Sequence, residues 1–158
     1  MANAMFRSDN LAGTVHGKNL ASVRMAEDLE NGCIVVLGGY EAGSREVREY
    51  SAPEADTAIE KIAILGSEEV NKEVKFDTVG DFINKEGSIA RGYIFEKGDV
   101  FAVTKEAISG DATVGSKLVV EAGSYKMKAV ADADGATTIG ECEAVEMDGA
   151  TTWYVIRV

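Results

Sequence analysis

The sequence is poor in the residue types that build catalytic and metal centres. Its 158 residues include one histidine, one proline, one tryptophan and two cysteines. His16 is the only histidine, and nothing near it in the sequence resembles a Ser/His/Asp arrangement or a Cys/His metal cluster. Carboxylates are plentiful, but no motif pairs them for acid/base work. We therefore expect no enzyme, no catalytic residue, no cofactor and no metal.

Basic residues are also few. Lys and Arg number 16 against 27 Asp and Glu, which gives a formal net charge of -11. Such a chain repels nucleic acid and anionic membranes, and a partner would have to be basic where it makes contact. No stretch approaches the roughly 18 to 20 apolar residues of a membrane span, and the start "MANAMFRSDN" lacks the apolar core of a signal peptide. We expect a protein that is made and kept in a cytoplasm.

The two cysteines, Cys33 and Cys142, are far apart in sequence, and each lies in a strand-like run. Free thiols in such runs behave as small hydrophobic side chains. We expect both to be structural thiols rather than a disulfide or a redox pair.

The composition changes near residue 30. The preceding segment mixes Asn, Gly, Ser and isolated apolar residues without a sustained period of 3.6 or 2, which favours an extended arm that becomes ordered on a partner. We therefore divide the chain into an N-terminal arm (residues 1–30) and a β-rich domain (31–158). A short helix at 21–29 is the alternative for the end of the arm. The candidate partner-binding residues are the larger apolar and basic side chains of the arm, Phe6, Arg7, Leu11, Val15, Leu20, Val23 and Arg24.

The β-rich domain contains short apolar runs separated by turn residues. In residues 31–90 the runs "CIVVLGG", "REVREY" and "KIAILG" predict strands in a smaller irregular lobe, with one helical turn between residues 76 and 84. In residues 91–158 the strands follow one another more regularly, at 92–95, 100–103, 118–120, 126–130 and in the last two segments "TTIGECEAVEM" and "TTWYVIRV". This is the pattern of a meandering antiparallel barrel. The predicted fold is mainly β, a small antiparallel β-barrel or sandwich-like domain with an extended N-terminal arm and short helical turns.

Turn residues mark the corners of this sheet. Asp134-Gly135 and Asp148-Gly149 lie between predicted strands, and Asp-Gly favours tight hairpins. Lys97-Gly98-Asp99 is known as an adhesion tripeptide, but its place between "GYIFE" and "VFAVT" predicts a hairpin corner. In the penultimate strand the apolar alternation slips, and a bulge at Gly140 would return Ile139 and Cys142 to one buried face.

Two ligand motifs are incomplete. The glycines of "GGYEAGSR" (38–45) resemble a phosphate-binding loop, but Ser44-Arg45 follows the last glycine where Lys and then Ser or Thr are required. The segment "DADG" from Asp132 resembles the start of a calcium loop, but Thr137 occupies the position that requires glycine. Turns account for both segments.

The order of the pieces resembles that of a known family. The segments "LENGCIVVLGG", "REVREY", "DFINKEGSIARGYIFEKGDVFAVTKEAI", "VGSKLVVEAGSYKMKAV" and "YVIRV" are similar to the head decoration, or capsid cement, proteins encoded beside the major capsid protein in tailed bacteriophages. The resemblance runs from about Leu29 to the C-terminus, and its most specific part is "NKEGSIARGYIFEKGDVFAVT". It implies a non-enzymatic virion protein that binds the major capsid protein on the capsid exterior and stabilises the shell, after assembly in the host cytoplasm. It implies no individual site residue.

Two alternatives remain open. One is another virion component, such as a tail or head-tail connector protein. The other is a small ligand- or carbohydrate-binding β module, for which a deep pocket containing Trp153 or Tyr125 would be the sign. Bound copies could be monomers, or trimers that use the apolar strands around Phe101 and Trp153.

Overall fold

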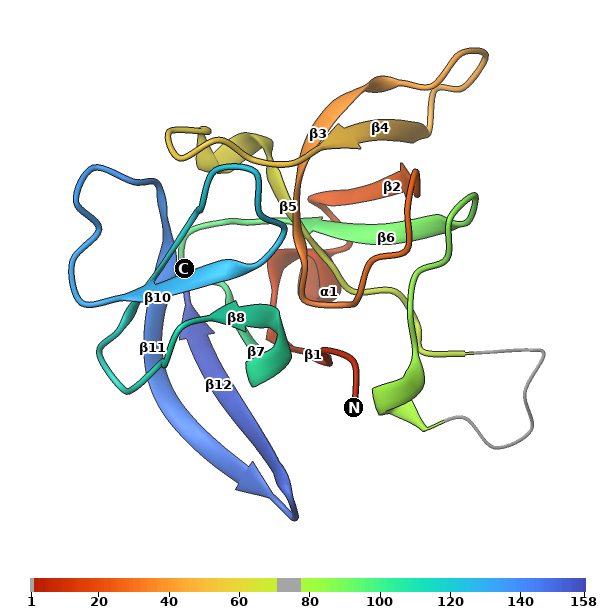
Figure 1. The fold of residues 1–158 in the computed structure, drawn as a ribbon. Coiled ribbons are helices and arrows are strands. Elements are labelled where there is room, and N and C mark those ends of the chain that lie inside the picture. The colour runs from red at the N-terminus through yellow and green to blue at the C-terminus, as the bar shows by residue number, and fades with distance from the viewer. Residues whose placement is uncertain (1, 71–77) are drawn as a thin grey trace.

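The computed structural model describes residues 2–70 and 78–158, which form two β-sheets packed against each other (Figure 1). One α-helix, α1 (Ala12–His16), and three 3-10 turns, η1 (Ile59–Lys61), η2 (Val79–Asp81) and η3 (Lys105–Ala107), join the strands of this described part. The strands are β1 (Phe6–Asn10), β2 (Leu20–Arg24), β3 (Ile34–Tyr40), β4 (Val47–Ser51), β5 (Ile62–Leu65), β6 (Ile89–Ile94), β7 (Val100–Thr104), β8 (Ile108–Ser109), β9 (Lys117–Val119), β10 (Met127–Val130), β11 (Thr138–Asp148) and β12 (Thr151–Arg157).

The first sheet closes into a barrel, in the order β2-β4-β3-β5-β6. Its strands pair antiparallel except for β2 and β4, which are parallel. The second sheet has seven strands in the order β1-β7-β12-β11-β9-β10-β8, with one parallel pair, β8 and β10. The predicted fold class is confirmed: the chain is mainly β, with a closed barrel, a second sheet and a few short helical turns.

The core explains why some strands are continuously apolar. In β5, Ile62 and Ile64 belong to the apolar cluster shared with the second sheet, whereas Ala63 and Leu65 point into the barrel cluster. All four side chains are fully buried. A strand that is covered on both faces needs apolar residues at every position, which is why "KIAILG" lacks polar alternation.

The N-terminal segment is not an extended arm. β1 pairs with β7 in the second sheet, and β2 pairs with β4 and β6 in the barrel. Residues 21–24 are therefore strand, and the alternative of a helix at 21–29 is wrong. The apolar residues of this segment are isolated in sequence because each strand is only five residues long. Such a strand is too short for an alternating pattern of apolar and polar residues to be recognised in the sequence.

The predicted domain boundary at residue 31 does not separate the two sheets. The barrel uses strands between Leu20 and Ile94, and the second sheet combines β1 with strands from Val100 onward. The lobe expected to be irregular thus contributes three strands, β3, β4 and β5, and the start of β6 to the closed barrel, whereas the expected C-terminal barrel is an open sheet. Because β2 is one of the barrel strands, deleting the first 24 residues would open the barrel.

The turns agree with the predictions from the sequence more closely than the strand pairings do. Asp148-Gly149 does form a tight hairpin, in which Asp148 pairs with Thr151 and Gly149 takes a φ of 61°. Asp134-Gly135 also forms a turn, but it joins β10 to β11, and β9 lies between these two strands. The bulge predicted at Gly140 is confirmed by the register shift between Thr138 and Gly140.

The Lys97-Gly98-Asp99 turn is a corner between sheets rather than a hairpin. It joins β6 of the barrel to β7 of the second sheet, and these two strands do not pair. Asp99 is only 5% exposed. Its carboxylate accepts hydrogen bonds from the backbone N–H of Ala12 at 2.9 Å and of Glu96 at 2.8 Å. The aspartate therefore holds the corner against α1 and is not presented to solvent.

Candidate docking surface

The structure separates the seven predicted contact residues into three groups. Phe6, Leu11 and Val23 pack inward. Leu11 and Val23 are 1% and 0% exposed, whereas Phe6 is partly buried against the core, with its ring stacked on Tyr93 at 5.7 Å between centroids. The prediction of a partner contact is wrong for Leu11 and Val23, because core packing has already covered both side chains.

Arg7 lies on the outer face of the second sheet. Its guanidinium donates hydrogen bonds to Asp9 and Glu146 and lies 5.2 Å from the ring centroid of Trp153. The hydrogen bond to Asp9 and then that to Glu146 raise the pKa of Arg7 well above its usual value. This cluster ties β1 to the β11–β12 hairpin and covers one face of the only tryptophan.

The third group is the exposed one. Val15 on α1 and Leu20 at the start of β2 are 57% and 44% exposed. Arg24 forms a two-pronged ion pair with Glu41, with both distances at 3.0 Å, and this hydrogen bonding raises its pKa. The side chains of Val15 and Leu20 therefore remain accessible to a partner protein, whereas the guanidinium of Arg24 is already paired with Glu41 within the chain.

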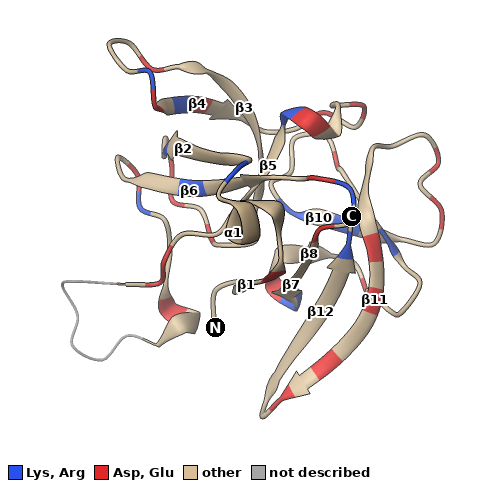
Figure 2. Cartoon of the chain, turned by 180° about the vertical axis from the view of Figure 1, so that it is seen from behind, with Lys and Arg blue, Asp and Glu red and all other residues tan. Residues whose placement is uncertain are grey.

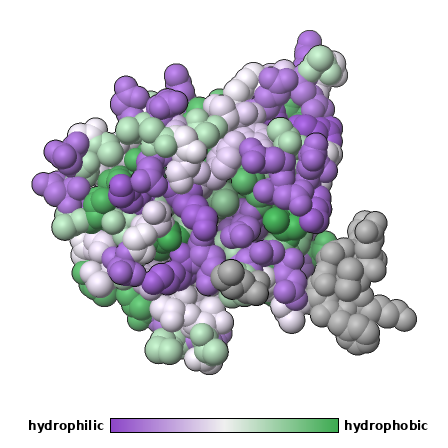
Figure 3. Space-filling model, in the orientation of Figure 1, coloured by the Kyte–Doolittle hydropathy of each residue, from purple (hydrophilic) through white to green (hydrophobic). Residues whose placement is uncertain are grey.

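A projecting hairpin presents apolar side chains that the sequence reading did not single out. β11 and β12 extend together well beyond the rest of the molecule (Figure 1), and apolar surface is visible along this projection (Figure 3). Met147 is 75% exposed and Val145 is 41% exposed. The alternation in "EAVEMDGATTW" could have revealed them, but an exposed apolar position in a strand looks the same in sequence as a buried one.

The hairpin has two chemically different faces. Directly paired residues share a face, and Val145 pairs with Tyr154 and Met147 with Thr152. This face continues the one through which Tyr154 packs on the core. The opposite face carries Glu146, which pairs with Trp153. Acidic residues recur along β11, whereas basic ones are sparse on the hairpin (Figure 2).

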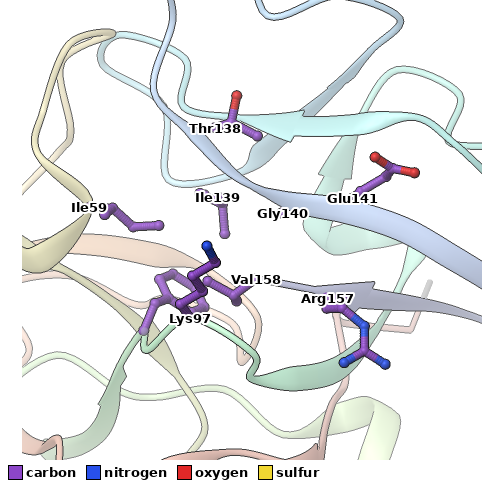
Figure 4. A pocket seen from close by; sticks show the side chains of 9 residues that line it. Ile59, Lys97, Thr138, Ile139, Gly140, Glu141, Arg157 and Val158 are labelled. Carbon is purple, nitrogen blue, oxygen red and sulfur yellow. The ribbon is translucent and has the colours of Figure 1, made fainter.

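A pocket lies at the base of the same hairpin, where the second sheet meets the loop before β5. Its volume is about 410 Å³. In Figure 4, Ile59 and Ile139 point toward a common space, and the guanidinium of Arg157 points away from it. The pocket is lined by Ile59, Phe95, Lys97, Thr138, Ile139, Gly140, Glu141, Arg157 and Val158. Neither Trp153 nor Tyr125, the residues named for a ligand-binding module, is among them.

The remaining motifs form no assembled centre in the described residues. No three His, Cys, Asp or Glu side chains of 2–70 and 78–158 cluster as metal ligands. The glycine-rich segment 38–45 is the end of β3 and the turn to β4. Asp132 lies 3.6 Å from the amine of Lys117. Cys33 and Cys142 are free and buried, as expected of structural thiols.

Comparison with known proteins adds no relative. No protein-family model matches the chain, and no curated protein or solved structure is detectably similar to it. Within the part of the chain that the structure describes, none of the helices has the length and apolar composition needed to cross a membrane.

Proposed function

We propose that this protein is a non-enzymatic structural component of a tailed-bacteriophage head. It binds the major capsid protein on the exterior of the shell and stabilises the particle. The observation that carries the proposal is the projecting β11–β12 hairpin, with Met147 and Val145 exposed beyond the body of the molecule. The order of strands and turns from Leu29 onward, which resembles capsid decoration proteins, supplies the kind of partner.

The hairpin suits attachment to a large surface. Its exposed apolar side chains lie on a two-stranded element that projects from the body of the molecule, so they can enter a depression on a neighbouring protein without rearrangement of the core. Burying a methionine or valine side chain contributes about 1.5–3 kcal/mol. A protein that binds only the assembled shell stabilises it by mass action, and many copies multiply the effect.

The charge of the chain favours a basic contact area. The formal net charge is -11, and acidic residues recur along β11 (Figure 2). Copies of the protein in solution repel one another, whereas a basic patch on the shell attracts each copy separately. Binding should therefore weaken as the salt concentration rises.

The test uses shells assembled from the major capsid protein without this protein. Purified protein is added, bound and free fractions are separated by sedimentation, and the bound copies are located by cryo-electron microscopy. We expect saturable binding at a symmetric set of exterior sites and a higher temperature of shell disruption. The images also distinguish single copies from trimers.

Two variants make the test specific to the hairpin. Met147→Asp should weaken binding at least tenfold, because it replaces about 1.5–3 kcal/mol of apolar burial by a charge. The matched control is Ile89→Asp on barrel strand β6, where Ile89 is 51% exposed, and it should bind within twofold of the wild type. Absence of association at micromolar concentration would overturn the proposal. A location confined to the tail of intact particles would favour the alternative virion role instead.

A further inference from the structure

β11 has an open edge along the outer half of the hairpin. Its inner half pairs with β9 from Thr138 to Glu141, and the backbone of Cys142 bonds to Ser116 and Gly115. Beyond that point the pairings of β11 in the described residues run to β12 alone, from Ala144 to Asp148. The other edge of this stretch faces solvent. A strand edge of this kind is a template on which a further strand can pair.

The turn geometry indicates which backbone groups are available. Asp148 and Thr151 flank a two-residue turn, and in such a hairpin the flanking pair is hydrogen-bonded to each other. Because the bonding direction alternates along a strand, the N–H and C=O groups of Glu146 point toward β12. Those of Val145 and Met147 point away from it, toward the open edge.

The side chains beside this edge define what an added strand would have to carry. On one face lie Val145 and Met147, which are apolar and exposed. On the other lie Glu146, whose carboxylate already accepts a hydrogen bond from Arg7, and the exposed acidic residue Asp148. An incoming strand that also alternates would place apolar residues beside Val145 and Met147 and a basic residue beside Asp148.

The same acidic residues argue against a second copy as the occupant. The segment from Glu143 to Asp148 contains three acidic residues and no basic one. Glu143 and Glu146 are paired with Arg157 and Arg7 within the chain, so the repulsion between two copies falls mainly on Asp148. Edge-to-edge pairing of two copies would bring these like charges close together, which is destabilising. Acidic side chains on an open edge are a known means of preventing self-association, and they leave the edge available to a basic segment.

We propose that the edge of β11 between Ala144 and Asp148 binds an extended segment of the capsid subunit by strand addition, and that this segment alternates apolar and basic residues. The inference rests on the proposed function for the identity of the partner. Main-chain hydrogen bonds from Val145 and Met147 supply the attachment, and the alternating side chains supply the selectivity.

The decisive comparison is between Val145→Pro and Val145→Ala, assayed on the same shells. Both variants lose the branched side chain, but only proline removes the outward N–H and blocks the edge with its ring. Proline is tolerated on an edge strand where the N–H faces solvent, so the fold should survive, which circular dichroism and thermal melting would verify. Val145→Pro should weaken binding at least tenfold relative to Val145→Ala. Met147→Pro, at the second outward position, provides the same comparison if Val145→Pro fails to fold.

A charge variant tests the basic character of the added strand. Asp148→Asn should weaken binding two- to fivefold at low salt and make its salt dependence shallower. Unchanged affinity and salt dependence would overturn that part of the inference.

The outcomes separate the two proposals. If the wild-type protein fails to bind shells, the proposed function fails and the inference fails with it. If the wild type binds and the Pro and Ala variants bind equally well, strand addition is overturned while shell binding stands. If analytical ultracentrifugation of the free protein shows a dimer that only the proline variants abolish, the occupant is a second copy and the inference is wrong.

Discussion

Replacing Asp99 tests whether the adhesion-like tripeptide is a structural corner. Its carboxylate accepts the backbone N–H of Ala12, the first residue of α1, at 2.9 Å and that of Glu96 at 2.8 Å. The residue that precedes the helix, Leu11, has no side chain able to cap it, so Asp99 performs this role from a distant part of the sequence. Asp99→Ala leaves both donors without their acceptor in a site where the aspartate is 5% exposed.

The cost follows from these two bonds. A hydrogen bond to a charged group contributes about 1.5–3 kcal/mol, and a buried donor without a partner retains its desolvation penalty. For two such bonds we expect a loss of about 3–6 kcal/mol in the free energy of unfolding. At roughly 2–4 °C per kcal/mol for a chain of this size, the melting temperature should fall by roughly 6–24 °C.

Urea denaturation followed by circular dichroism measures the change, with two variants beside it. Lys97→Ala removes an exposed neighbour in the same tripeptide and should stay within about 0.5 kcal/mol of the wild type. Asp99→Asn keeps one acceptor oxygen and should fall between the two. If Asp99→Ala were as stable as Lys97→Ala, the assignment of Asp99 as the buried anchor of the corner would be refuted.

Three further predictions concern packing, pH and metal. Gly140→Ala should destabilise the protein by about 1–3 kcal/mol, because the new Cβ would collide with the carbonyl of Arg157. The control, Gly39→Ala, lies in a strand with open space around the new Cβ and should change stability by less than about 1 kcal/mol. Equal urea midpoints for the two variants would contradict this prediction. Burial raises the pKa of the Cys33 thiol from 9.0 to about 11, so between these pH values the unfolded thiol loses a proton that the folded one keeps. The stabilisation is fully present below pH 9 and is lost by pH 11, by roughly 3 kcal/mol; Cys33→Ala should flatten this part of the stability curve, and an unchanged slope would refute the assignment. EDTA should leave the melting temperature unchanged, and a large drop would restore the calcium interpretation of the "DADG" segment.

Local sequence determined the features that depend on neighbouring residues. The apolar run Ile62–Leu65 predicted a buried strand because both of its faces are covered, and the alternation slip near Gly140 predicted the bulge. Asp148-Gly149 predicted a hairpin because a two-residue turn requires a residue that accepts positive φ. The two scattered cysteines predicted buried free thiols, and both are buried and free.

Tertiary structure alone decided which strands pair and which apolar residues are covered. β1 and β2 acquire their order from strands as distant as β7 and β6, so the isolated apolar residues of the N-terminal segment resembled those of an unpacked arm. Leu11 and Met147 illustrate the difference: nothing in their immediate sequence distinguishes them, yet one is 1% and the other 75% exposed. Burial of a side chain depends on contacts with segments that are remote in sequence. The free energy of those contacts is gained only when the whole sheet forms, so the local sequence pattern does not predict which side chains are buried.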